Sequence, residues 1–151
     1  NYLYHEVVPL MNAKNQNRYL ITMGASFGAY HAMNFGLRHP DVTNRILGMS
    51  GIYDIRFLLP GHHDDWVYFN NPMDYVANLS DPWYYHHLRQ DDIRLATGHG
   101  PYEDSGPTYG FSELLRRKDI RHSVDDWGPD GGHDWPYWKK MMNESIWRPF
   151  G

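Results

Sequence analysis

Short apolar runs alternate with helix-like amphipathic segments along most of this chain. The runs at residues 19–23, 46–49 and 93–97 have the length and composition of buried strands. A fourth run, at 120–127, is more polar, as expected for a strand at the edge of a sheet. Residues 26–38, 112–118 and 135–146 carry apolar side chains at helical spacing. This alternation predicts an α/β fold, with a mainly parallel sheet of about four strands and helices on both faces.

The chain opens in the middle of a helical pattern. Positions 3, 7, 10 and 11 are apolar and lie on one face of a helix. Pro9 lies inside this pattern and cannot donate a hydrogen bond to the carbonyl of His5, so we expect a kink there. Because the chain starts at Asn1 within this helix, we also expect a further segment to precede it.

The connection at residues 52–92 interrupts the rhythm of strands and helices. It is too long for a simple loop between a strand and a helix. Two helix starts are indicated, at Asn71-Pro72 and Asp81-Pro82, since a capping residue followed by proline is typical of a first helical turn. We interpret 52–92 as a cap-like insertion within a single domain that spans 1–151. The alternative is a crossover that contains helices but takes no part in binding.

Composition narrows the classes of function. The length of 151 residues suits one domain, and 41% hydrophobic with 16% aromatic residues excludes a disordered chain. The net charge of −4 provides no basic surface for nucleic acid. No apolar run approaches the roughly 18 residues that a membrane-spanning helix needs. The absence of cysteine excludes disulfides and a thiolate nucleophile.

The pentapeptide Gly-Ala-Ser-Phe-Gly at 24–28 carries the chemistry. It matches G-x-S-x-G and joins a predicted strand to a predicted helix, which is the setting of a nucleophile elbow that lifts Ser26 above the sheet. We expect Gly24 and Gly28 to be required, because a Cβ at either position would collide within the tight turn. The Phe27 amide is then one oxyanion donor. The alternative is a glycine-rich turn in which Ser26 only caps a helix.

A nucleophilic serine needs a base and an acid, which follow it along the chain in this fold. His133 lies in the segment Gly-Gly-His-Asp-Trp at 131–135, between the last strand and the last helix, and is the predicted base. The acid is expected after the third strand, where Glu103 and Asp104 are both candidates. The unused one should cap a helix or be solvated. Asp54, after the second strand, is a third candidate that more plausibly caps the turn following it.

These motifs together resemble a bacterial family of small α/β-hydrolase-fold esterases of the esterase D and antigen 85-like group. The resemblance runs from Tyr19 to the C-terminus. It rests on Gly-Ala-Ser-Phe-Gly-Ala-Tyr-His at 24–31, Arg-His-Pro-Asp at 38–41, Met-Ser-Gly at 49–51, Phe-Asn-Asn-Pro at 69–72, Leu-Ser-Asp-Pro-Trp at 79–83 and Gly-His-Asp-Trp-Pro at 132–136. It implies Ser26 as nucleophile, His133 as base and a bacterial, cytoplasmic protein.

The acid departs from the pattern of this group. Many members carry Gly-x-x-Asp after the corresponding strand, whereas this chain has Gly-His-Gly-Pro-Tyr-Glu at 98–103. Counting back from residues 120–122 places Glu103 nearer the expected position than Asp104. We therefore favour Glu103 as the acid.

The N-terminal part of the chain departs further from the pattern of this group. Complete members resemble a full sheet with several strands before the elbow strand, so this chain is expected to have a truncated α/β-hydrolase fold. The elbow strand would keep an open edge, which is unstable alone in water. We expect a homo-oligomer that covers this edge, the alternative being a fragment bound to its other piece. The loop with the second oxyanion donor would also be missing, and Arg56, Tyr30 and His31 are candidate substitutes.

The sequence thus predicts a serine carboxylesterase that acts through an acyl-enzyme on small to medium uncharged esters, without cofactor or metal. An acyltransferase using the same intermediate is possible. The alternative class is a non-catalytic truncated hydrolase that serves as an oligomerisation module. For the esterase, we expect the aromatic side chains of 52–92 to line the acyl pocket. These are Trp66, Tyr68, Phe69, Tyr75, Trp83, Tyr84 and Tyr85.

Overall fold

A four-stranded parallel sheet forms the centre of the computed structural model, which describes residues 2–149. The strands are β1 (Ile21–Ala25), β2 (Arg45–Met49), β3 (Asp92–Thr97) and β4 (Ser123–Asp126), and they pair in chain order. Every pairing is parallel. The parallel sheet, the four strands and their order along the chain are confirmed. Because all strands run the same way, their carboxyl ends and the loops that follow lie at one edge of the sheet.

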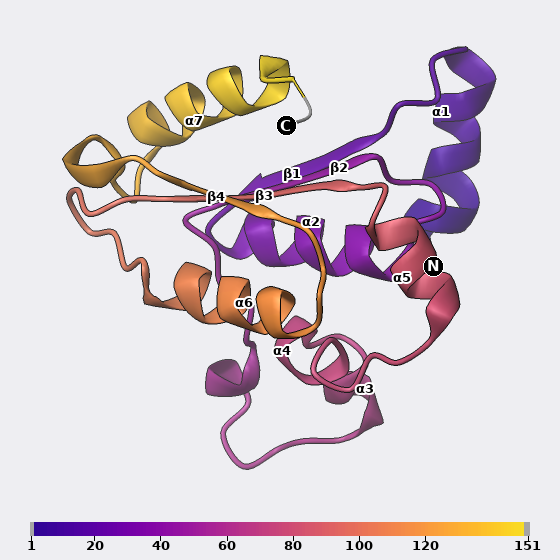
Figure 1. Ribbon diagram of the computed structural model, residues 1–151, viewed down its shortest axis with the longest axis horizontal. Coiled ribbons are helices and arrows are strands. Elements are labelled where there is room, and N and C mark those ends of the chain that lie inside the picture. Colours follow the sequence, from indigo (N-terminus) through magenta and orange to yellow (C-terminus); the bar gives the residue numbers. More distant parts are fainter. Residues whose placement is uncertain (1, 150–151) are drawn as a thin grey trace.

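Helices cover both faces of the sheet, as predicted. Helices α2 (Phe27–Arg38) and α6 (Gly106–Arg117) pack on one face, and α7 (Trp135–Trp147) lies on the other (Figure 1). Successive side chains of β2 alternate between the faces, with Ile46 in the cluster under α2 and α6 and Leu47 in the cluster with Met141 of α7. Burial on both faces explains why these strands are continuously apolar. No helix within residues 2–149 is long and apolar enough to cross a membrane.

The connection between β2 and β3 contains several short helical segments. They are η2 (Arg56–Leu58), α3 (Asp65–Tyr68), α4 (Pro72–Tyr75) and α5 (Pro82–Leu88). Both predicted helix starts are confirmed, and the Asp81 carboxylate caps α5 by accepting a hydrogen bond from the Trp83 amide at 2.8 Å. Val76 and Leu88 are buried in the same core cluster as α2 and α6. The segment therefore extends the main core, and α3 and α4 form a layer beyond α2 and α6 (Figure 1).

The first helix differs from the expectation of a single kinked helix. A π-helical turn, η1 (Leu3–Val7), leads into α1 (Val8–Lys14), and the Val8 amide donates to the carbonyl of Leu3. η1 and α1 are continuous, because Val7 and Val8 both have right-handed helical dihedrals, so Pro9 leaves a carbonyl of the preceding turn without its helical donor. Val8 is the buried residue of α1, whereas Leu10 and Met11 remain about half exposed. The predicted apolar face is therefore largely uncovered.

The two edge strands of the sheet, β1 and β4, are less buried than the two central strands. β4 is partly exposed, as its polar sequence predicts. β1 forms the opposite edge, so the expected open edge is confirmed, but the expectation of a buried strand is wrong, since Met23 is 45% exposed. β1 begins only at Ile21. The Leu20 amide instead donates to the Asn44 side chain at 2.8 Å, which takes it out of the strand ladder.

The C-terminal end of α7 is anchored by two buried arginines. Arg45 of β2 donates to the carbonyls of Ser145 and Ile146 at 3.0 and 2.7 Å. Arg94 of β3 donates to the carbonyl of Ser145 at 3.3 Å, and Asp92 lies between the two guanidinium groups, 2.7 Å from each. These cations satisfy carbonyls that have no partner within the helix and complement the negative end of its dipole.

The buried carboxyl group of Asp91 should make the free energy of unfolding depend on pH. The residue is 3% exposed, one carboxylate oxygen has no hydrogen-bond partner among the described residues, and burial raises the pKa of the carboxyl group to about 7. Because the folded-state pKa lies above the unfolded one, the charged form destabilises the fold, and the penalty grows from about pH 4 until it is complete above about pH 7. Asp91→Asn should raise the melting temperature at pH 8 by about 5 °C, and by less at pH 5. Thermal scans at both pH values test this, with the exposed Asp65→Asn as control; equal shifts at both pH values would contradict it.

Candidate active site

Ser26 lies at the sharp turn between β1 and α2. Its backbone has φ 54° and ψ −122°, a conformation that non-glycine residues rarely adopt and that is typical of strained functional sites. The Ser26 amide donates to the carbonyl of Met49 at 2.9 Å, which ties the turn to the end of β2. The Phe27 amide begins α2 and has no acceptor within the helix. It is therefore available to an oxyanion next to Ser26.

The two glycines of the elbow differ in what they permit. A Cβ on Gly24 would lie 2.1 Å from the carbonyl oxygen of Gly28, a contact that backbone atoms cannot relieve cheaply. A Cβ on Gly28 would meet nothing within 4 Å. The expectation that both positions exclude a side chain is therefore correct for Gly24 and wrong for Gly28.

This difference gives a matched pair of variants. Gly24→Ala should displace the elbow and lower both stability and the reactivity of Ser26. Gly28→Ala lies in the first turn of α2 and should raise the free energy of unfolding by up to about 1 kcal/mol, since alanine favours a helix. Chemical denaturation of both variants measures the effect. Equal destabilisation by the two substitutions would contradict the predicted difference between the two positions.

His133 reaches Ser26 from the loop that precedes α7. Its Nε2 atom lies 2.9 Å from the Ser26 Oγ atom. Asp134, the next residue, caps α7 by accepting from the Trp135 amide at 2.7 Å, so the start of the helix fixes the place of His133. The His133 amide also donates to the carbonyl of Pro101 at 2.9 Å. The imidazole is about one-third exposed, which leaves room for substrate beside it.

Glu103 lies behind His133. Its Oε2 atom is 3.3 Å from the imidazole Nδ1 atom, and its side chain is fully buried. The other carboxylate oxygen accepts a hydrogen bond from the Thr97 hydroxyl at 2.8 Å. The structure therefore places Ser26, His133 and Glu103 in a line, with the imidazole between the hydroxyl and the carboxylate. This contact is an ion-pair distance and not a hydrogen bond, since the buried Oε2 atom of Glu103 has no hydrogen-bond partner among the described residues.

The two other candidate acids have different partners. Asp104 caps α6 by accepting from the Gly106 amide at 2.9 Å. This cap explains why α6 begins six residues earlier than its apolar pattern predicts. Asp54 accepts from the Arg56 amide and guanidinium at 3.0 and 2.9 Å, and these bonds hold its pKa below the usual range. Asp54 thus caps the turn that follows it.

The candidate second oxyanion donors are not equally free. Tyr30 is buried, which raises its pKa, and its hydroxyl donates to the carbonyl of Asn70 at 2.9 Å. Arg56 is engaged with Asp54, and its Nη1 atom lies 3.4 Å from Asp74. His31 is exposed, and its ring packs edge-on against Phe27. Tyr30 and Arg56 would have to give up existing bonds to serve an oxyanion.

The aromatic insertion does not enclose the serine. A cavity of about 360 Å³ is lined by Tyr68, Phe69, Tyr75 and Tyr84, but by none of Ser26, Glu103 and His133. The expectation that these side chains form the acyl pocket at the serine is therefore wrong for this cavity. The insertion lies beyond α2 and α6 (Figure 1). Its cavity is also lined by Leu37 and Arg38 at the C-terminal end of α2, whereas Ser26 precedes the first residue of that helix.

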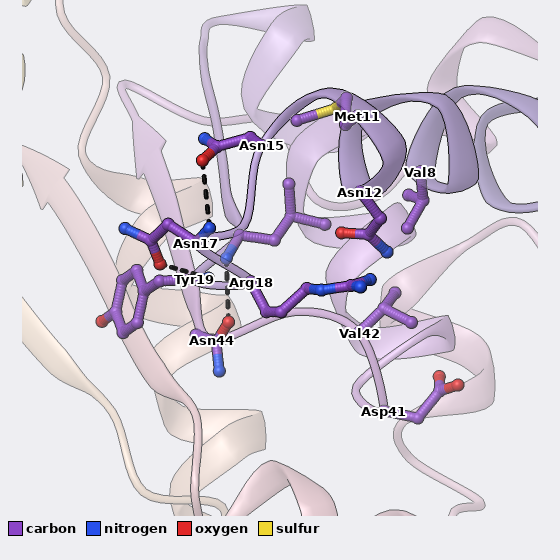
Figure 2. Close-up of a pocket in the computed structure, with 11 residues that line it drawn as sticks. Val8, Met11, Asn12, Asn15, Asn17, Arg18, Tyr19, Asp41, Val42 and Asn44 are labelled. Carbon is purple, nitrogen blue, oxygen red and sulfur yellow. Dashed lines mark hydrogen bonds between the residues drawn. The ribbon is translucent and has the colours of Figure 1, made fainter.

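A second hollow, of about 340 Å³, lies at the amino end of β1 (Figure 2). Val8 and Met11 of α1 line it together with polar residues of two loops, namely Asn15, Asn17, Arg18, Asp41 and Asn44. Asn15 and Asn17 accept backbone hydrogen bonds from the residues two places on, which shapes the turn into β1. Because Ser26 follows the opposite end of β1, this hollow is separate from the candidate catalytic residues.

The parallel sheet, the elbow and the order of serine, acid and histidine define an α/β-hydrolase fold. A family model described as "Putative esterase" matches residues 1–148, so the chain belongs to this esterase family. A comparison with curated protein sequences gave no match.

Solved structures share the fold. A ferulic acid esterase superposes with a TM-score of 0.72 at 23% identity, over 96% of this chain and 58% of its own. An S-formylglutathione hydrolase from Agrobacterium tumefaciens gives 0.75 at 14% identity, over 96% and 54%. The fluorophosphonate-binding serine hydrolase F of Staphylococcus aureus gives 0.64 at 20% identity, over 95% and 61%. The chain thus spans somewhat more than half the length of these neighbours.

Proposed function

We propose that this chain is a serine carboxylesterase in which Ser26, His133 and Glu103 form the catalytic triad. The observation that carries the proposal is the 2.9 Å contact between the Ser26 hydroxyl and the His133 imidazole, with the buried Glu103 carboxylate on the opposite nitrogen. A serine hydroxyl is a weak nucleophile until an adjacent base accepts its proton. Membership of the esterase family supports the same reaction.

The reaction then follows from these positions. His133 takes the Ser26 proton as the hydroxyl oxygen attacks the ester carbonyl, and the Phe27 amide donates to the resulting oxyanion. His133 returns the proton to the departing alcohol, which leaves an acyl group on Ser26. Water, deprotonated by His133, attacks this acyl group and releases the carboxylic acid and free Ser26. An alcohol in place of water would make the same intermediate serve acyl transfer.

The substrates we propose are small to medium uncharged esters. Two exposed aromatic residues are close in sequence to the reacting groups, since Phe27 follows Ser26 and Trp135 lies two residues after His133. Phe27 is 42% and Trp135 65% exposed, so both can cover an apolar acyl or alcohol group. The proposed substrate class thus rests on Phe27 and Trp135, and not on the aromatic cavity of the insertion.

A fluorophosphonate probe tests the triad without knowledge of the natural ester. The Ser26 oxygen should displace fluoride from phosphorus and gain one phosphonyl group, seen in the intact mass and located by peptide mapping. His133→Ala should keep the fold and react far more slowly, because the hydroxyl loses its base. A folded wild-type protein without label would overturn the esterase proposal and favour the non-catalytic module.

We further propose that a second copy of this chain covers the open edge of β1. An apolar hollow of about 400 Å³ runs beside this strand, and its walls come from α1, β1 and α2. A two-fold axis would pair β1 with its own copy in antiparallel fashion and satisfy the free backbone groups of both edges. The lining residues include Leu3, Val7, Met11, Met23 and Phe35.

The oligomeric state can be measured by light scattering after size exclusion. A dimer at micromolar concentration that Met23→Lys converts to a monomer is expected. A wild-type monomer over the same range would overturn the proposal. The cytoplasmic location implied by the resemblance stays a prediction.

A further inference from the structure

Ser50 has an unusual conformation beside the candidate site. It follows β2 directly, is 3% exposed and has φ 48°, in the left-handed region that favours glycine. Its amide donates to the carbonyl of Ala96 at 2.8 Å, which fixes the backbone there. A serine in this conformation is less favourable than a glycine would be. A favourable contact of the serine side chain is therefore needed to offset this backbone cost.

The Ser50 hydroxyl contacts the helix that follows His133. It accepts a hydrogen bond from the Trp138 indole nitrogen at 2.9 Å. The Trp138 ring packs edge-to-face against the His133 imidazole, with ring centres 5.1 Å apart and planes at 78°. Trp138 thus forms a wall beside the imidazole, and Ser50 holds that wall through a single, partly buried hydrogen bond.

The end of β2 consequently contacts both sides of the reacting pair. The carbonyl of Met49 holds the Ser26 amide, and the hydroxyl of the next residue holds Trp138 against His133. The 2.9 Å contact between Ser26 and His133 joins residues 107 positions apart in the chain. Met49, the last residue of β2, and Ser50, which follows it, therefore hold Ser26 and the wall beside His133 from adjacent backbone positions.

We propose that Ser50 and Trp138 are positioning residues that hold the His133 imidazole in register with the Ser26 hydroxyl, an inference that rests on the proposed role of His133 as base. Without the wall, the imidazole can turn about its side-chain bonds and lose alignment with the Oγ atom. Small misplacements of a catalytic group cost large factors in rate. Substrate binding should be unaffected, because neither residue is proposed to touch the ester.

Two conservative variants separate positioning from folding. Trp138→Phe keeps an aromatic wall but removes the indole N–H, and Ser50→Gly removes the hydroxyl while relieving the left-handed strain. Each should lower kcat by on the order of tenfold with KM nearly unchanged. The melting temperature of Ser50→Gly should stay close to that of the wild type, since relief of strain offsets the lost hydrogen bond. Trp147→Phe, at an 83% exposed position of α7, is the matched control.

The double variant tests whether the two residues act as one unit. Ser50→Gly combined with Trp138→Phe should be no slower than the slower single variant, because both remove the same hydrogen bond. Multiplied effects, or wild-type kcat in both single variants, would overturn the inference. A fall in kcat that follows the loss of stability would also overturn it, by showing a structural role only.

A readout independent of turnover separates this inference from the proposed function. The His133 ring protons, assigned by their loss in His133→Ala, should give one sharp set of nuclear magnetic resonance signals in the wild type. They should broaden or shift in Ser50→Gly and Trp138→Phe, but not in Trp147→Phe. Unchanged ring signals would overturn the positioning role even in an active protein. Changed signals in a protein that hydrolyses no ester would uphold the positioning and overturn the esterase proposal.

Discussion

Replacing Ser26 with alanine is expected to lower ester turnover by about a millionfold, to the level left by binding and the oxyanion donor alone. The substitution removes only the Oγ atom that lies 2.9 Å from His133. Alanine is as strained as serine at φ 54°, so the elbow keeps its backbone cost. Hydrolysis of a p-nitrophenyl ester of a short acid measures the effect.

The matched control for this variant is Ser123→Ala, which removes a hydroxyl from the exposed edge strand β4. It should retain wild-type turnover. If Ser26→Ala kept more than a hundredth of the activity while staying folded, another group would have to be the nucleophile, and the assignment of the elbow would be wrong.

The second large effect is expected at the acid. Glu103→Gln should lower kcat by about 10⁴-fold, since a neutral amide can neither stabilise the imidazolium nor hold the useful tautomer. Glutamine is nearly isosteric and can still accept the Thr97 hydroxyl, so the buried site stays filled. Steady-state kinetics at neutral pH, with the melting temperature as a check on folding, give the result.

Asp104→Asn provides the matched control, because asparagine keeps the oxygen that caps Gly106. Its kcat should stay within about twofold of the wild type, as for most surface changes away from a site. The reverse outcome, with a slow Asp104→Asn and an active Glu103→Gln, would assign the acid to Asp104.

Much of the fold follows from local patterns. The strands β2 and β3 are apolar throughout because both faces are covered, and their bounds differ from the prediction by one residue. The start of α7 follows from the Asp134 cap and the proline after Trp135. α6 extends further than predicted because its first turn, at Gly106-Pro107, carries capping signals but little apolar periodicity.

Features that depend on distant packing were harder to predict. The aromatic residues of 52–92 indicate a pocket by composition, but the path of the insertion under α2 decides where that pocket lies. Glu103 and Asp104 are adjacent, and only the turn of the loop shows which one faces His133. Thr97 behind Glu103 and Trp138 beside His133 were not anticipated. A polar residue closing an apolar strand was the available signal for Thr97.

The two ends of α7 are attached to the sheet by different contacts, and this difference should determine which part of the protein unfolds first on heating. Two arginines hold the far end of the helix, whereas the near end, next to His133, relies on a small apolar cluster around Met141 and on the Ser50 contact. The large apolar cluster under α2 and α6 contains no residue of α7. Warming should therefore free the front of α7 while the sheet and its main core persist. The reactivity of Ser26 would then disappear several degrees below the melting temperature measured by circular dichroism. It would return on cooling, because the arginines keep the C-terminal end of α7 bound to the sheet.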